Sequence, residues 1–161
     1  HYRTTGPEIW SQTDGQVDAF VALAGTGGTL HGTGKYLREV NPNIRIFGVQ
    51  PSVDSRLGSG EANGDVIDGV GAFRGVPEEC VAKFVLGNVY DECMEISAQE
   101  AFKTAREIIK TDGLFLGTSS AAAICAALKV AQLSEFEGKT IVTIAPDDGM
   151  KYLSTKLYQK V

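Results

Sequence analysis

The chain has 161 residues, about the length of one domain, and its 15 Lys and Arg against 20 Asp and Glu give a formal net charge of −5. Hydrophobic residues make up 43% and charged residues 22%, which excludes an intrinsically disordered chain. The acidic balance argues against a nucleic-acid partner, and no run approaches the roughly 18 apolar residues that a membrane helix needs. We therefore expect neither a nucleic-acid nor a membrane partner. Glycine is the one residue type well above its average frequency in proteins, with 19 residues, and this excess predicts glycine-built loops.

The first third of the chain has the pattern of a strand–helix–strand unit. Residues 17–24 (VDAFVALA) form a continuous apolar run, which is typical of a parallel strand covered on both faces. A glycine cluster follows, and a helix is predicted from there through Glu39 because Asn41-Pro42 ends it. In chain order we expect a short helix over 5–13, the strand over 17–24, a glycine loop over 25–29, this helix and a second strand over 44–49.

The remainder of the chain continues the alternation. Ser97 and Glu100 match a capping box, in which the hydroxyl accepts from the backbone three residues on and the carboxylate reaches back. Gly113 ends the helix that they begin. In order, we expect a loop over 52–88 with a short helix near 52–59, a strand over 89–96, the capped helix, a short apolar stretch at 114–116, an alanine-rich helix from Gly117 to about Ala131, a strand over 140–145 and a terminal helix that starts at 146–149.

Alternating helices and nearly unbroken apolar strands predict an α/β fold. The sheet is expected to be open and mostly parallel, with helices on both faces in three layers. No internal repeat interrupts the pattern, so residues 1–161 are interpreted as a single α/β domain. The three cysteines (Cys80, Cys93 and Cys125) lack CxxC spacing, which indicates reduced thiols and neither a disulfide framework nor a zinc site. This cysteine usage favours a cytoplasmic protein.

The glycine loop Gly25-Thr26-Gly27-Gly28-Thr29 lies between a buried strand and a helix. Unpaired N–H groups at a helix N-terminus suit a phosphate, and glycines there let the backbone approach it closely. A nucleotide-triphosphate loop is excluded because Thr29 stands where its first glycine is needed. A dinucleotide fingerprint fails at Leu30 and at Gln50, where an acidic ribose partner is missing. The loop therefore predicts a site for a compact monophosphate, with a packing turn as the alternative.

Two polar clusters follow later in the chain. Thr118-Ser119-Ser120 opens a helix, either as ordinary capping hydroxyls or with one hydroxyl turned toward a ligand beside the glycine loop. A hydrolase nucleophile is excluded there because the second glycine of G-x-S-x-G is missing. Asp147-Asp148 has no neighbouring His or Cys, so we interpret it as a charge pair at a helix N-terminus. No metal site is predicted.

Five sequence strings together resemble one enzyme family. They occur in that family's order and span nearly the whole chain: TTGPEIW at 4–10, GTGGTLHGTGKYLRE at 25–39, DGVGA at 68–72, LFLGTSSAAA at 114–123 and PDDGMKYLST at 146–155. The chain is similar to the pyridoxal-phosphate-dependent cysteine synthases (O-acetylserine sulfhydrylases) and the related cystathionine β-synthases. The resemblance implies the large domain of the tryptophan-synthase-β-like enzymes that use this cofactor.

The resemblance also implies roles for particular residues. Gly25, Thr26, Gly27, Gly28 and Thr29 would hold the cofactor phosphate, Ser119 would bind the pyridine nitrogen, and Gly69, Val70 and Gly71 would line the substrate side. The implied reaction is β-replacement, in which sulfide converts O-acetylserine or a similar β-substituted alanine into L-cysteine. The implied partners are the amino-acid substrate, sulfide and, for the intact enzyme, a second copy in a homodimer.

One family feature is missing from the chain. None of its nine lysines stands in the family's Schiff-base motif, and Lys35 lies about two turns into the helix after the glycine loop. The chain therefore resembles the C-terminal half of the enzyme, and we expect it to be inactive without the N-terminal half. Two other interpretations stay open: cystathionine β-synthase activity in the intact protein, and a non-catalytic relative that binds a phosphate ligand or a partner protein.

Overall fold

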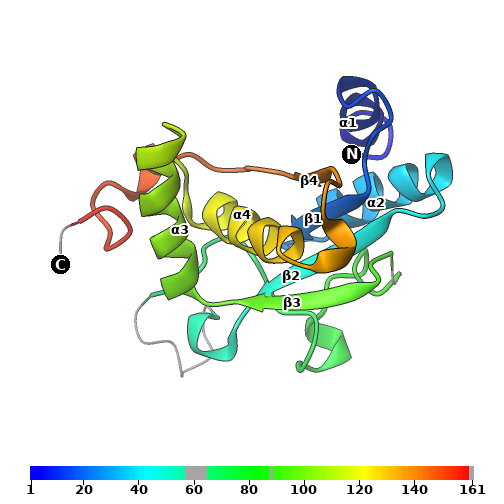
Figure 1. Ribbon diagram of the computed structural model, residues 1–161. Coiled ribbons are helices and arrows are strands. Elements are labelled where there is room, and N and C mark those ends of the chain that lie inside the picture. Colours follow the sequence, from blue (N-terminus) through cyan, green and yellow to red (C-terminus); the bar gives the residue numbers. More distant parts are fainter. Residues whose placement is uncertain (57–64, 88, 160–161) are drawn as a thin grey trace.

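A computed structural model describes residues 1–56, 65–87 and 89–159. Four strands form one sheet in the order β3-β2-β1-β4, and every adjacent pair is parallel (Figure 1). The sheet therefore confirms the predicted α/β class with an open, parallel sheet. The strands are β1 (Ala19–Leu23), β2 (Arg45–Pro51), β3 (Glu92–Ile96) and β4 (Ile141–Thr143).

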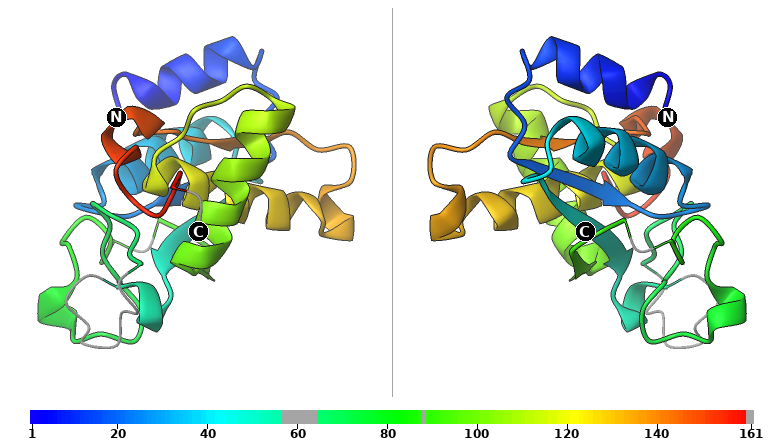
Figure 2. Two further views of the ribbon diagram at one scale, coloured as in Figure 1. Left: turned by 90° about the vertical axis from the view of Figure 1, so that its left-hand side faces the viewer. Right: turned by 90° about the vertical axis from the view of Figure 1, so that its right-hand side faces the viewer.

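Helices cover both faces of the sheet, as the apolar strands predict (Figures 1 and 2). Successive residues of a strand point to opposite faces. Phe20 accordingly packs in the cluster beneath α1 and α2, whereas Val21 packs in the cluster beneath α3 and α4. Both side chains are completely buried. The helices are α1 (Thr5–Gln12), α2 (Gly28–Val40), α3 (Ala98–Thr111) and α4 (Thr118–Ala131).

Three strands are shorter than the sequence predicts, and the first of them, β1, spans Ala19–Leu23 within the predicted 17–24. β3 begins at Glu92 and not at 89. The carboxylate of the preceding Asp91 accepts the Ile46 N–H at 2.7 Å, so a side chain, and not a strand carbonyl, is the acceptor for this backbone donor of β2. β4 ends at Thr143 and not at 145. The Thr143 hydroxyl donates to the Val21 carbonyl at 2.8 Å where the ladder stops.

The prediction of a helix at the end of the chain is wrong. Only a 3-10 turn forms over Gly149–Tyr152, because the backbone around it is bonded to the segment before α4. Gly149 N donates to Phe115 O, and Leu116 forms an isolated antiparallel bridge with Asp148. The helix expected near 52–59 is limited to a 3-10 turn over Val53–Ser55, and residues 57–64 lie outside the described residues.

The predicted capping box at the start of α3 is confirmed. Ser97 Oγ accepts the Glu100 N–H, and Glu100 Oε2 accepts the Ser97 N–H at 2.9 Å. Glu100 also pairs with Lys129 of α4 at 2.7 Å. Burial opposes the charged form of Glu100, but bonds from Lys129 and Ser97 outweigh it and lower the pKa of the carboxyl from 4.5 to about 2.

We expect Glu100→Gln to show that this carboxylate stabilises the fold in a pH-dependent way. A carboxyl whose pKa is lower in the folded state stabilises it above the unfolded pKa, and this contribution disappears as the pH falls toward about 2. Urea unfolding at pH 7, 5 and 3 should therefore show the gap between wild type and variant narrowing with acidity. The exposed Glu137→Gln is the control, and a constant gap for Glu100→Gln would contradict the assignment.

Candidate cofactor site

A cavity of about 400 Å³ lies beyond the carboxyl ends of β1 and β4. Ligands of open α/β sheets bind at this edge. The cavity brings together six of the residues singled out in the sequence, which come from three separate segments. These are Gly25, Thr26, Thr29, Gly69, Val70 and Ser119. The other three predicted residues (Gly27, Gly28 and Gly71) belong to the same loops but are not among the lining residues.

The glycine loop leads directly into α2. Gly27 is the N-cap residue with a left-handed φ of 83°, and a Cβ there would lie 2.5 Å from Val85 Cγ2. The first intrahelical bond is His31 N to Gly27 O, so the preceding N–H groups of the helix have no carbonyl partner within it. No described side chain caps this end, and its first turn holds no acidic residue.

A small ligand group has room at the start of α2. A Cβ added at Gly28 would meet only Thr26 Oγ1 at 3.6 Å and His1 at 3.7 Å, which are ordinary contact distances. The Thr29 hydroxyl faces the same cavity and lies 3.2 Å from His1 Nε2. Free N–H groups, a positive helix end and nearby hydroxyls together fit a phosphate.

Residues 69–71 lie against the glycine loop through a close backbone contact. Gly71 N donates to Ala24 O at 2.9 Å. A Cβ on Gly25 would come within 2.7 Å of Gly69 O. Gly71 also faces a neighbouring cavity of about 430 Å³, which has Cys80 and Lys83 in its wall. Residues 69–71 therefore contribute to the walls of two cavities, which also share Gly25 and Thr26.

Ser119 is fixed at the other side of the cavity. It is 7% exposed, and its Oγ donates to Asp68 O at 2.6 Å. The Asp68 N–H in turn donates to Thr118 Oγ1 at 3.2 Å. These two bonds join the N-terminus of α4 to the loop that carries Gly69–Gly71. These hydroxyls do not cap α4, whose N-cap is Gly117 with no side-chain bond of its own, so the capping interpretation is wrong. Ser119 lies in the wall of the cavity beside the glycine loop.

Sequence reasoning missed how Asp147 acts. We expected it to stand at the start of a terminal helix, but its carboxylate accepts the N–H groups of Ser119 at 3.2 Å and Ser120 at 2.7 Å, at the N-terminus of α4. Asp148, by contrast, accepts from Met150 N at 2.8 Å in the short 3-10 turn. Both residues do serve helix N-termini. Asp147 and Ser120 are 27 residues apart, so no local sequence pattern could indicate that the carboxylate accepts from this helix.

Lysine 151 was likewise not expected in this site. Its Nζ pairs with Asp68 Oδ2 at 2.6 Å at the mouth of the cavity. The hydrogen bond from Lys151 lowers the pKa of the Asp68 carboxyl, and the same bond raises the pKa of Lys151. Because the lysine side chain is 68% exposed, the pair stabilises the fold little. Within the described ranges, no group of three or more His, Cys, Asp or Glu could hold a metal ion.

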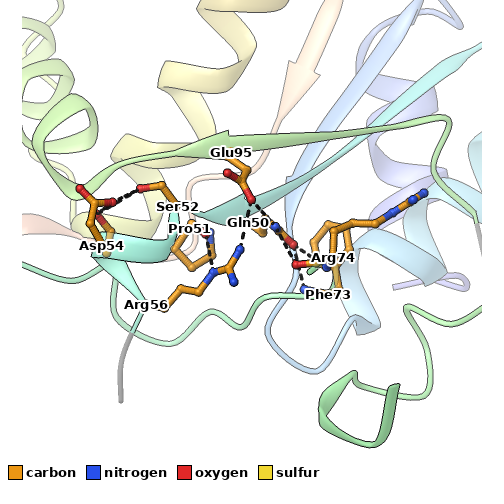
Figure 3. A network of polar contacts seen from close by, with 9 residues as sticks. Gln50, Pro51, Ser52, Asp54, Arg56, Phe73, Arg74 and Glu95 are labelled. Carbon is orange, nitrogen blue, oxygen red and sulfur yellow. Dashed lines mark hydrogen bonds and ion pairs between the residues drawn. The ribbon is translucent and has the colours of Figure 1, made fainter. Parts of the chain in front are cut away.

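Gln50 stands where a dinucleotide site would have an acid, and it bonds the segment just after Gly71 (Figure 3). It is 1% exposed, and its Oε1 accepts the backbone N–H groups of Phe73 at 2.9 Å and Arg74 at 2.8 Å. Its Nε2 donates to Glu95 at 2.7 Å, and Glu95 also pairs with Arg56. The amide therefore ties the end of β2 to the segment that follows Gly71.

Comparisons with known proteins agree with this geometry. The family model described as "Pyridoxal-phosphate dependent enzyme" matches residues 1–147. The chain belongs to this family. Cysteine synthase A of Escherichia coli (strain K12) is 36% identical over 160 residues, which cover 98% of this chain and 50% of that protein. The chain thus spans about half the length of the curated relatives that it matches. Across 1–56, 65–87 and 89–159, no helix has the length and hydropathy to cross a membrane.

Two solved structures share both fold and sequence with the chain. O-acetylserine sulfhydrylase isoform 3 from Entamoeba histolytica superimposes with a TM-score of 0.81 at 40% identity, over 98% of this chain and 45% of that one. An O-acetylserine-dependent cystathionine β-synthase from Helicobacter pylori gives a TM-score of 0.82 at 40% identity, over 98% and 49%. The fold is therefore that of these enzymes.

We expect Gly27→Ala and Gly28→Ala to differ sharply in stability. At Gly27 the left-handed φ and the contact with Val85 should cost about 1–3 kcal/mol. At Gly28, where the helix begins and a Cβ has room, the change should stay within about 1 kcal/mol. Urea unfolding of the two variants checks this difference, and equal losses would show that the left-handed cap is not what requires glycine.

We expect Gln50→Leu to loosen the loop after Gly71. The change leaves the N–H groups of Phe73 and Arg74 without their acceptor, at a cost of about 1–3 kcal/mol for the buried Phe73 N–H and less for the part-buried Arg74 N–H. Hydrogen exchange at these two amides should accelerate, together with a fall in the unfolding free energy. The exposed Gln132→Leu should change neither. Protection that survives in Gln50→Leu would mean that another group holds the loop.

Proposed function

We propose that this chain is the cofactor-phosphate portion of a cysteine synthase. The overall reaction would be β-replacement: the Cβ–O bond of O-acetylserine breaks, acetate leaves, and sulfide forms the new Cβ–S bond of L-cysteine. The observation that carries the proposal is the pairing, across one cavity, of an uncapped helix N-terminus with the Ser119 hydroxyl. The names of the relatives, cysteine synthase and O-acetylserine sulfhydrylase, supply the reaction.

The residues of the cavity fit pyridoxal phosphate. Residues 25–29 would hold the phosphate through backbone N–H groups at the start of α2, with the Thr26 and Thr29 hydroxyls beside them. Ser119 would bind the pyridine nitrogen, and Gly69–Gly71 would line the substrate side. When bound, the cofactor supplies the electron sink for loss of the β-substituent. The neutral Ser119 hydroxyl, in place of a carboxylate, would not hold the ring as a pyridinium and so suits elimination.

The same proposal covers the rest of the intact protein. We infer that the Schiff-base lysine lies in a preceding segment that corresponds to the other half of the relatives, and that the assembled enzyme is a homodimer. A cytoplasmic location is favoured by the three free thiols, Cys80, Cys93 and Cys125. Mass measurement of the full-length protein by light scattering tests the dimer.

We expect Gly28→Asp to weaken phosphate binding while the fold survives. A carboxylate at the first residue of α2 stabilises the positive helix end but repels a second anion. Titration calorimetry with inorganic phosphate and with pyridoxal phosphate should show at least about a tenfold weaker affinity, a loss of about 1.4 kcal/mol. Gly28→Ala is the comparison variant, because it adds the Cβ without the charge and should weaken binding less than Gly28→Asp does.

Two outcomes would count against the proposal. Equal affinities in wild type and Gly28→Asp would place any phosphate away from α2. If the wild-type chain binds neither ligand, the result would favour a partner-binding role in place of cofactor binding. For the reaction itself, the full-length protein should release acetate and form cysteine in equal amounts, whereas the 161-residue chain alone should form none. Cysteine production by this chain alone would overturn the assignment of the lysine to another segment.

A further inference from the structure

Two helix N-termini face the same cavity, but their electrostatic states differ. The N-terminus of α2 has no side-chain cap among the described residues and no acid in its first turn. The N-terminus of α4 receives the Asp147 carboxylate, whose two oxygens accept the N–H groups of Ser119 and Ser120. A helix N-terminus carries roughly half a positive charge, which a carboxylate at this position neutralises. Only one of the two ends is therefore left to attract an anion.

Asp147 is held in place by more than these two bonds. The Tyr152 hydroxyl donates to its Oδ2 at 2.9 Å, and the Ser120 hydroxyl lies 2.6 Å from both Oδ1 and the Asp147 carbonyl. Gly117 N donates to the same carbonyl at 3.0 Å. Both the carboxylate and the backbone carbonyl of Asp147 thus bond the first turn of α4. Together they fix the direction in which that turn faces the cavity.

Gly117 shows how closely Asp147 packs. A Cβ on Gly117 would overlap the Asp147 carboxyl carbon, so glycine is required at the N-cap of α4 by this neighbour and not by its own φ of −81°. No side chain can separate the turn from the carboxylate. The position of Ser119, two residues further on, follows from this contact and from its bond to Asp68.

We propose that Asp147 is the positioning residue that sets the polarity of the cavity. It closes the α4 end to anions and aims the Ser119 hydroxyl, so that a ligand with a phosphate and a ring enters with the phosphate at α2 and the ring at α4. The inference rests on the proposed binding of pyridoxal phosphate. It adds a determinant of orientation that lies outside the glycine loop and outside Ser119.

The test separates the ring end of the ligand from its phosphate end. In Asp147→Asn the shape is kept but the charge is lost, so Ser119 is held less firmly and the α4 end becomes attractive to anions. We expect the affinity for pyridoxal phosphate to fall at least about tenfold. The affinity for inorganic phosphate should be unchanged or higher, because the α2 site is intact and a second positive end is exposed. Titration calorimetry with each ligand measures both.

Asp148→Asn is the matched control, since this neighbouring carboxylate is exposed, accepts only from Met150 N, and its loss should leave both affinities unchanged. A parallel loss of both affinities in Asp147→Asn would reveal a merely structural role and overturn the proposal. Unchanged affinity for pyridoxal phosphate would overturn it too. A wild-type chain that binds neither ligand would instead refute the proposed cofactor site, and the orientation inference with it.

A milder variant covers the case in which Asp147→Asn does not fold. Tyr152→Phe removes the hydroxyl that donates to Oδ2, the oxygen that also accepts the Ser119 N–H. This variant should lower the affinity for pyridoxal phosphate by a smaller factor, about two- to fivefold, and should leave the affinity for inorganic phosphate unchanged. Equal weakening of both ligands by Tyr152→Phe would speak against the proposal as clearly as the same result in Asp147→Asn.

Discussion

The direct backbone contact between the glycine loop and residues 69–71 sets the spacing on which the rest of the site is built. Gly71 N bonds to Ala24 O, and Gly69 O lies where a side chain of Gly25 would have to go. With no side chain between them, the two loops are held at a fixed separation at the carboxyl end of β1. Asp68 precedes this contact by one residue, and its backbone binds both Thr118 and Ser119. The start of α4 is thereby placed opposite the start of α2.

The loop on the far side of this contact depends on a second polar anchor. Gln50 reaches from the end of β2 to the backbone of Phe73 and Arg74, and Glu95 and Arg56 complete its hydrogen bonding (Figure 3). Because a buried amide is costly unless it is paired, the interaction fixes the loop in one place. Gly69–Gly71 are then held from both sides, by the glycine loop and by Gln50.

The sequence was sufficient for features that depend on local chemistry. Buried parallel strands appear as apolar runs, and the Ser97–Glu100 capping box lies within four residues, so both could be predicted. Features set by distant partners could not. The end of β4 depends on a hydroxyl bonded to Val21, and the missing terminal helix depends on backbone bonds to Phe115. Asp147 shows the same limit, because its carboxylate serves a helix that begins 29 residues earlier in the chain.

The Ser119 hydroxyl also links the two sides of the cavity through its single proton. A carbonyl oxygen can only accept a hydrogen bond, so the 2.6 Å bond to Asp68 O commits that proton to the loop. A ligand atom that accepts at Ser119 must compete with Asp68 for it, whereas a ligand atom that donates meets a free lone pair. Binding of an acceptor at Ser119 therefore weakens the tie between α4 and Asp68, and Asp68 leads directly into Gly69–Gly71. The α4 end of the cavity and residues 69–71 are in this way energetically coupled through one hydroxyl group.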